Sequence, residues 1–205
     1  AKSAASLCES LGHDVEELTV ELDADTVTQA FICIYLAGAS WTIKSMALVT
    51  GSEPTEEAFE PLTWTMHTLG EQIAAPDYLL AVTALQAMSR TVARLFAPYD
   101  AILTPTITEP PYPLGTFEAP PDNPMASLLR ASTVVPFTAI ANFTGLPAMS
   151  VPLHWNAAGL PVGTMFTGRY GDEGTLFRLA GQLERARPWD ARRPGSIPPL
   201  PPPAL

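Results

Sequence analysis

The spacing of apolar residues along the chain predicts mostly helices. Apolar positions recur every three or four residues in seven stretches: 2–11, 26–50, 56–74, 76–96, 125–132, 136–145 and the segment that follows Asp172. Gly12, Gly51 and Gly145 follow three of these stretches and are typical C-terminal helix stops. Asp25 and Asp172 stand where the side-chain oxygen of an N-cap residue is expected.

Alternation of apolar and polar residues predicts strands between the helices. Leu18, Val20 and Leu22 alternate with polar residues as in a half-buried strand, and Ala101–Leu103 is a short apolar run. The runs AMSVPL and PVGTMF flank the polar insert HWNAAGL, which is the pattern of a hairpin. Pro147, Pro152 and Pro161 lie within it, and proline marks edges and bulges of sheets. We therefore interpret this hairpin as the element that closes the sheet and sets the angle of the following helix.

The 26–50 stretch differs from the other predicted helices because it is apolar on nearly every side. Phe31, Ile34, Trp41 and Leu48 lie on one side, and the opposite side is apolar as well. Such a helix is expected to be buried on more than one side.

Prolines define the irregular segments. Residues 105–124 (PTITEPPYPLGTFEAPPDNP) predict a long loop, and loops of about 20 residues in a compact domain are usually functional or disordered. Residues 191–205 form a proline-rich tail that we expect to be disordered. The expected organisation is a single α/β domain over residues 1–190, followed by this tail.

Composition narrows the choice of function. The formal net charge is −10, which opposes binding to nucleic acid, and Arg187, Arg192 and Arg193 are too few to reverse it. Cys8 and Cys33 are too few for a disulfide framework and are expected to be reduced. No apolar run reaches the about 20 residues that cross a bilayer, so we expect a cytoplasmic protein without membrane contact. Residues 1–12 lack an initiating Met, and the chain is expected to begin inside a longer protein.

No catalytic constellation is visible in the residues alone. His13, His67 and His154 have no metal-ligand spacing, and no phosphate-binding or dinucleotide-binding motif occurs, so no cofactor or metal is expected. Ser150 lies inside a predicted strand, without a turn to project it. Lys44 and Ser45 are adjacent on a helix and point about 100° apart.

Five passages, in order, resemble the amidase signature family of hydrolases. They are LCESLGHDVEE, FAPYDAILTPT, FTAIANFTGLPAMSVPL, GLPVGTMFTGRYGDEGTLFRLAGQLE and ERARPW. The resemblance covers residue 1 to about 190. Residues 31–41 and LTWTMHTLGEQIAAPDYLLA look most like bacterial amidases that act on hydrophobic linear or cyclic amides, including the branch that opens the 6-aminohexanoate cyclic dimer.

The resemblance implies a mixed, twisted central sheet covered by helices, and amide hydrolysis by a Ser–cis-Ser–Lys triad. In that family the triad and a glycine-serine-rich loop lie in the N-terminal half. Nothing here matches them, so the chain resembles the C-terminal half only. It is expected to contain no catalytic residue and to need the N-terminal portion as its partner.

The resemblance also supplies candidate substrate-pocket residues. Thr138, Ala141 and Asn142 match the family's passage that reaches the acyl pocket, although packing of the helix beside the hairpin explains them equally well. Cys33 is a fourth candidate, because a small side chain on a buried helix suits a pocket wall, but buried Cys is usually inert. The expected ligand is a small amide.

Three hypotheses of function remain open at this point. The first is the C-terminal portion of an amidase, inert alone, which predicts a large exposed apolar patch or a tightly held partner. The second is a non-catalytic binding or scaffold module derived from that fold, without such a patch. The third is a self-sufficient hydrolase that uses Ser45 with Lys44. Assembly into a homo-oligomer is left open.

Overall fold

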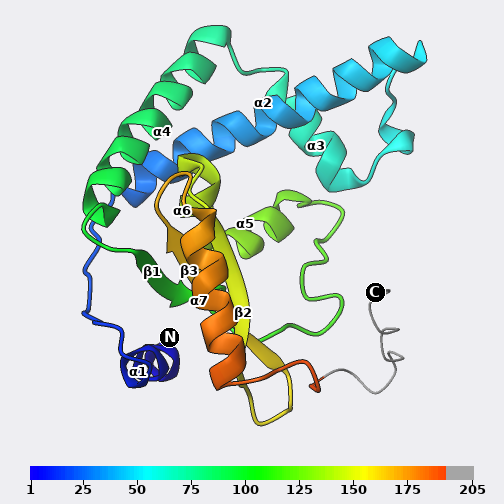
Figure 1. Ribbon diagram of the computed structural model, residues 1–205. Coiled ribbons are helices and arrows are strands. Elements are labelled where there is room, and N and C mark those ends of the chain that lie inside the picture. Colours follow the sequence, from blue (N-terminus) through cyan, green and yellow to red (C-terminus); the bar gives the residue numbers. More distant parts are fainter. Residues whose placement is uncertain (193–205) are drawn as a thin grey trace.

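A computed structural model describes residues 1–192, and Figure 1 shows its ribbon. The described residues form these helices and strands in order: α1 (Lys2–Ser10), α2 (Ala24–Thr50), a 3-10 turn (Glu56–Ala58), α3 (Pro61–Gly70), α4 (Ala75–Phe96), β1 (Ala101–Pro105), α5 (Met125–Val134), α6 (Pro136–Thr144), β2 (Ala148–Trp155), β3 (Pro161–Gly168) and α7 (Glu173–Ala186). The predicted α/β class is confirmed. The predicted tail beyond Arg192 lies outside the described residues.

The sheet has three antiparallel strands in the order β1-β3-β2. The predicted hairpin is confirmed as β2 and β3, joined by a turn at residues 156–160. Asn156 closes that turn, because its side-chain oxygen accepts hydrogen bonds from the amides of Ala158 and Leu160. The pairing register shifts between Val151 and His154, so Pro152 lies at a β-bulge, as proline in a strand requires.

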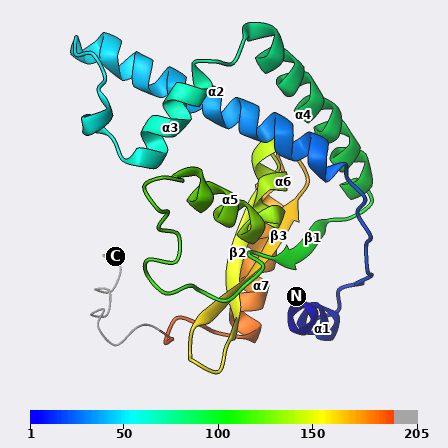
Figure 2. The ribbon, with the colours of Figure 1, turned by 180° about the vertical axis from the view of Figure 1, so that it is seen from behind.

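The two faces of the sheet belong to two apolar clusters. Val151, Leu153 and Phe166 face α1 and α7, where Leu153 and Leu183 are only 1% and 0% exposed. Ile102 faces the other way, toward a cluster around Val92 of α4. Figures 1 and 2 show α7 and α5 on opposite sides of the strands.

The predicted strand at residues 18–22 is not formed. Residues 13–23 carry no helix or strand assignment, and no described strand pairs with them. The alternating side chains are nevertheless used, because Leu18, Val20 and Leu22 pack against the cluster around Val92. The alternating pattern therefore correctly identified which side chains pack against the core. It could not predict a strand, because a strand also needs a neighbouring strand to pair with its backbone hydrogen-bonding groups.

The N-cap prediction was wrong for α2 and right for α7. Asp23, rather than Asp25, caps α2, and its Oδ1 accepts from the Thr26 amide at 3.0 Å. Asp25 falls in the first turn, where a carboxylate suits the helix dipole. Asp172 caps α7 as predicted and accepts from the Thr175 amide at 3.2 Å. Gly51 and Gly145 end α2 and α6 in the left-handed conformation.

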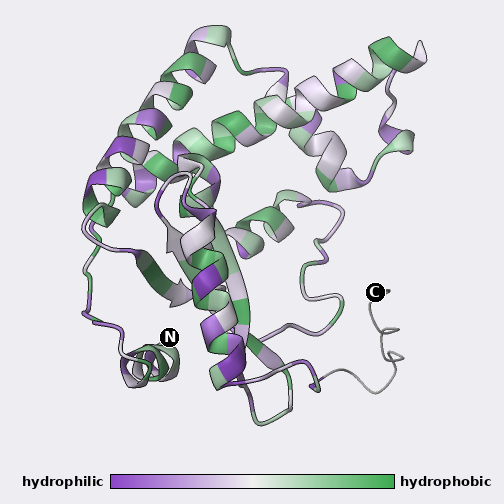
Figure 3. Ribbon diagram, in the orientation of Figure 1, coloured by the Kyte–Doolittle hydropathy of each residue, from purple (hydrophilic) through white to green (hydrophobic). Residues whose placement is uncertain are grey.

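The prediction that α2 is buried on more than one side is confirmed only in part, because α2 contacts two helices but keeps several large apolar side chains exposed. Leu36, Ser40 and Ile43 are buried, and α2 packs against α3 and α4. Trp41, by contrast, is 70% exposed. Figure 3 shows apolar turns along α2, and Figure 2 shows its C-terminal half extending beyond α4.

Helix α2 also corrects the expectation about membrane-length segments. Its 27 residues include an 18-residue window of mean hydropathy 1.5, which is long and apolar enough to cross a bilayer by length and composition alone. Only 11% of that window is buried inside the described chain.

Candidate substrate-pocket residues

The four predicted pocket residues lie on two helices. Thr138, Ala141 and Asn142 lie on α6 at spacings of three and four residues, so they share one side of that helix. Thr138 and Ala141 are half-buried and Asn142 is exposed. Cys33 is half-buried on α2 and is a free cysteine. Whether these residues contact a substrate stays a prediction.

Helix α6 is held against α4 through residues other than the predicted pocket residues. Ile140 and Phe143 pack against the cluster around Val92. The Ser89 hydroxyl of α4 donates to the Phe143 carbonyl at 2.9 Å. The side that carries Asn142 is therefore fixed in orientation while remaining accessible.

The described residues contain no group of three or more His, Cys, Asp or Glu side chains that could hold a metal. The Lys44 ammonium lies 2.8 Å from Glu71 Oε1, and this hydrogen bond lowers the pKa of the Glu71 carboxyl. Lys44 is thus paired with a carboxylate on the neighbouring segment and does not face Ser45. The geometry gives no support to a Ser45–Lys44 dyad.

Sequence reasoning did not single out His67 as a buried residue. His67 is 4% exposed and packs against Trp64 at a ring distance of 5.1 Å. Its Nε2 lies 3.8 Å from Glu71, and its Nδ1 has no hydrogen-bond partner within the described part of the chain. The signal was its position in an apolar helical repeat, which predicts burial but not the missing partner.

Ser150 is structural, as predicted for a serine inside a strand. Its hydroxyl lies 2.7 Å from the Thr106 hydroxyl, with which it shares a hydrogen bond. A Cβ at Gly163 would lie 2.6 Å from both oxygens. Three of the family-like passages, LTPT, AMSVPL and GLPVG, therefore meet at this point of the sheet.

The proline-rich loop is attached to α5. Its residues carry no helix or strand between Thr106 and Pro124, and Pro105 belongs to β1. Arg130 of α5 makes two hydrogen bonds to Glu109, at 3.1 and 3.0 Å, and its guanidinium lies over the Tyr112 ring. Two parallel bonds of this kind give a defined orientation, so the loop is tied to the sheet side that carries α5.

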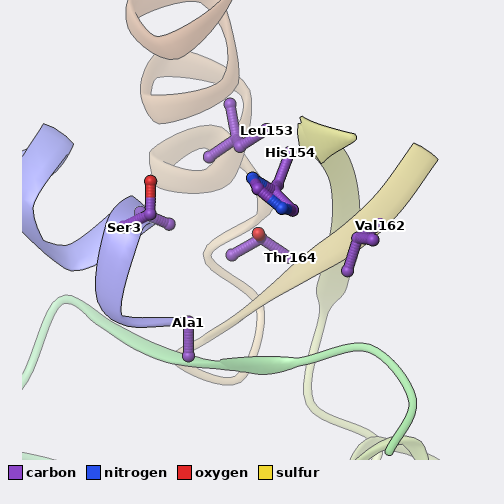
Figure 4. A pocket seen from close by; sticks show the side chains of 7 residues that line it. Ala1, Ser3, Leu153, His154, Val162 and Thr164 are labelled. Atoms are coloured by element: carbon purple, nitrogen blue, oxygen red, sulfur yellow. The ribbon is translucent and has the colours of Figure 1, made fainter. Parts of the chain in front are cut away.

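Two small cavities lie at the far end of the hairpin, and neither is lined by the predicted pocket residues. The first, of about 220 Å³, lies between the start of α1 and the hairpin strands, and Figure 4 shows His154 and Thr164 in its wall. The second, of about 240 Å³, is lined by residues that include Trp155, Arg187 and Arg192. The Arg187 guanidinium donates to the Leu153 carbonyl at 2.8 Å, and that of Arg192 lies 4.3 Å above the Trp155 ring.

Comparison with known proteins identifies the family. The Amidase family model matches residues 1–177, and the chain belongs to this family. It is 36% identical over 190 residues to the putative amidase AmiC of Mycobacterium tuberculosis, covering 90% of this chain and 38% of that protein. It is 28% identical over 201 residues to the 6-aminohexanoate-cyclic-dimer hydrolase of Pseudomonas sp. NK87, covering 95% and 41%.

Solved structures agree with the fold. A 6-aminohexanoate cyclic dimer hydrolase complexed with substrate matches with a TM-score of 0.87 and 27% identity, over 95% of this chain and 42% of that one. A bacterial aryl acylamidase matches with a TM-score of 0.68 at 18% identity, which supports the fold alone. The chain thus spans about two fifths of the length of these relatives, and the resemblance to the amidase signature family is confirmed.

Proposed function

We propose that this chain is the C-terminal portion of an amidase-signature hydrolase of carboxylic amides. The observation that carries the proposal is the family match over residues 1–177 by a chain that covers only 38% to 42% of its relatives. In this proposal the Ser–cis-Ser–Lys triad belongs to the N-terminal portion and needs no cofactor. The described residues supply walls of the substrate pocket and close the sheet.

The pocket walls in this proposal are α6 and α2. Thr138, Ala141 and Asn142 present small or polar side chains on a helix that α4 holds in place, and Cys33 adds a small side chain from α2. The relatives named 6-aminohexanoate-cyclic-dimer hydrolase suggest a small linear or cyclic amide as substrate. We also propose a cytoplasmic location in a bacterial cell.

The exposed side of α2 favours this proposal over a stand-alone scaffold module. A module that works alone is expected to keep its surface free of large apolar patches. Trp41 and Leu48 are instead 70% and 87% exposed. This exposure is expected of a surface that the rest of an enzyme covers.

The test is activity with and without the N-terminal portion. The isolated chain should hydrolyse no amide and should not react with a fluorophosphonate probe. Co-expression with the N-terminal portion should give amide hydrolysis and a single labelled serine on the N-terminal portion. Turnover by the isolated chain, with labelling at Ser45, would refute the proposal.

A further inference from the structure

Several large apolar side chains of α2 are exposed. They are Tyr35 (47% exposed), Trp41 (70%), Met46 (55%), Leu48 (87%) and Val49 (87%). Trp41 and Leu48 are seven residues apart and lie on one stripe of the helix, while Tyr35, Met46 and Val49 lie on a neighbouring stripe. We call these five residues the α2 outer face.

The opposite side of α2 is already packed against other helices of the chain. Helix α3 packs there so closely that a Cβ at Gly70 would overlap the carbonyl oxygen of Leu36. Ser40 and Ile43 are buried in the same contact, and the Lys44–Glu71 pair lies beside it. The apolar character of the outer face is therefore not needed to hold α2 on α3.

The outer face suits burial against protein. Each Trp, Leu, Val or Met side chain gains about 1.5–3 kcal/mol when it leaves water, and exposed apolar patches on soluble proteins mark interaction surfaces. A bilayer fits less well, because Asp25 and Lys44 belong to α2 and its inner side is fixed to α3. The relatives are about 2.5 times as long as this chain, so most of the enzyme's surface-forming residues lie outside it.

We propose that the α2 outer face is the surface on which the N-terminal portion of the amidase packs. The identity of this partner rests on the proposed function, whereas the location of the interface rests on α2 alone. Trp41 is the central contact, because tryptophan is enriched among the residues that dominate interface energies, and Leu48 lies on the same stripe of the helix.

The experiment compares association of the two portions, produced separately or co-expressed. Trp41→Ser and Leu48→Ser should each weaken binding by about tenfold or more. Phe177→Ser on α7 is the matched control, since Phe177 is also a large exposed side chain, at 77%, and it should change binding less than about twofold. Far-UV circular dichroism verifies that each variant retains its helices.

A second readout follows Trp41 itself. Its fluorescence should shift to shorter wavelength when the N-terminal portion binds, and Trp41→Phe should remove that shift. Equal binding by all three serine variants, or no binding by the unchanged chain, would overturn the proposed interface. Two other outcomes would also overturn it. In the presence of the N-terminal portion, Trp41 could instead be buried in a homodimer of this chain, or it could be buried by adsorption to phosphatidylglycerol vesicles.

The outcomes separate this inference from the proposed function. A complex that forms through Trp41 and Leu48 but hydrolyses no amide supports the interface and contradicts the enzymatic proposal. A complex that hydrolyses amides but is insensitive to both substitutions supports the enzymatic proposal and contradicts the interface.

Discussion

The hydroxyls of Thr106 and Ser150 share a hydrogen bond of 2.7 Å directly above the backbone of Gly163. Thr106 follows β1, Ser150 belongs to β2 and Gly163 to β3, so this contact joins all three strands. The Thr106 amide also donates to the Gly163 carbonyl at 3.2 Å. The glycine at position 163 of the hairpin thus has a geometric explanation, because only a residue without a Cβ leaves room for the hydroxyl pair.

Gly163→Ala should destabilise the chain. The added Cβ would lie 2.6 Å from both hydroxyl oxygens, and overpacking of this kind costs about 1–3 kcal/mol. Urea denaturation measures the loss. Gly38→Ala is the control, since a Cβ there meets nothing within 4 Å and should be neutral or stabilising. Adding Ser150→Ala and Thr106→Ala should recover part of the loss, and no recovery would contradict the steric explanation.

Gly70→Ala should have a larger effect than Gly163→Ala. Its Cβ would meet the backbone of Leu36, which cannot rotate away as a hydroxyl can. We expect a loss of more than about 2 kcal/mol in the free energy of unfolding and separation of α3 from α2. Limited proteolysis between α2 and α3, compared with the Gly38→Ala control, measures this separation. Unchanged proteolysis together with an unchanged free energy of unfolding would contradict the close approach of Gly70 to the Leu36 backbone.

The N-cap aspartates should make stability depend on acid. Hydrogen bonds from the hydroxyl and amide of Thr175 lower the pKa of Asp172, and those of Thr26 lower the pKa of Asp23. Because folding lowers these pKa values, their contribution is complete above the unfolded value of about 3.9 and is lost as pH falls through the folded pKa.

Asp172→Asn tests this dependence, because asparagine caps a helix about as well as aspartate but does not ionise. The variant should have nearly the parent Tm at neutral pH and a smaller fall in Tm between about pH 5 and pH 2. Asp122→Asn, in the loop before α5, is the control. An acid dependence identical to that of the parent would contradict the assigned role of Asp172.

The two cysteines should differ in reactivity. Cys8 is 5% exposed, and burial raises the pKa of its thiol, which disfavours the reactive thiolate. Cys33 is half-buried. Iodoacetamide should therefore modify Cys33 first in the folded chain and Cys8 only on unfolding, as peptide mass spectrometry can measure. Cys33→Ser should abolish labelling of the native chain, whereas equal labelling of both thiols would be inconsistent with the burial of Cys8.

Local sequence signals predicted most elements of the fold. Asp172 was correctly predicted as an N-cap, and Gly51 and Gly145 as helix ends, because these roles depend only on the neighbouring backbone. Residues 18–22 and the outer side of α2 were misassigned because strand pairing and burial depend on distant partners. Periodicity shows which side of an element is apolar and tends to be buried, but it does not show which other element buries that side.

The candidate pocket residues could not have been chosen from sequence patterns without the family resemblance. Nothing in the spacing of Thr138, Ala141 and Asn142 distinguishes a pocket wall from ordinary helix packing, and Cys33 lies on another helix far away in sequence. The close approaches of Gly70 to Leu36 and of Gly163 to the hydroxyl pair were also invisible to pattern analysis. They require the three-dimensional crossing of separate elements.

The two edges of the described sheet differ in how they are protected. On the β2 edge, Pro152 lies at a bulge and Pro147 precedes the strand, and both features oppose addition of a further strand. On the β1 edge the only proline is Pro105, the last residue of the strand, and residues 101–104 carry neither proline nor charge. The Thr106 amide donates to the Gly163 carbonyl of β3. Because successive amides of a strand point in opposite directions, those of Ile102 and Thr104 also point toward β3, whereas that of Leu103 points away from the sheet.

Hydrogen exchange of the Leu103 amide should therefore report whether the N-terminal portion extends the sheet. In the isolated chain this amide should exchange much faster than those of Ile102 and Thr104, which are bonded to β3. On β2, the Gly168 amide donates to the Pro147 carbonyl, so the Ser150 amide also points outward and serves as the matched control. Binding of the N-terminal portion should slow exchange at Leu103 by about a hundredfold or more, as expected when an exposed amide enters a stable ladder, and leave Ser150 unchanged. Protection of Leu103 in the isolated chain, or equal protection of Ser150 on binding, would mean that the difference between the two edges does not determine where the sheet grows.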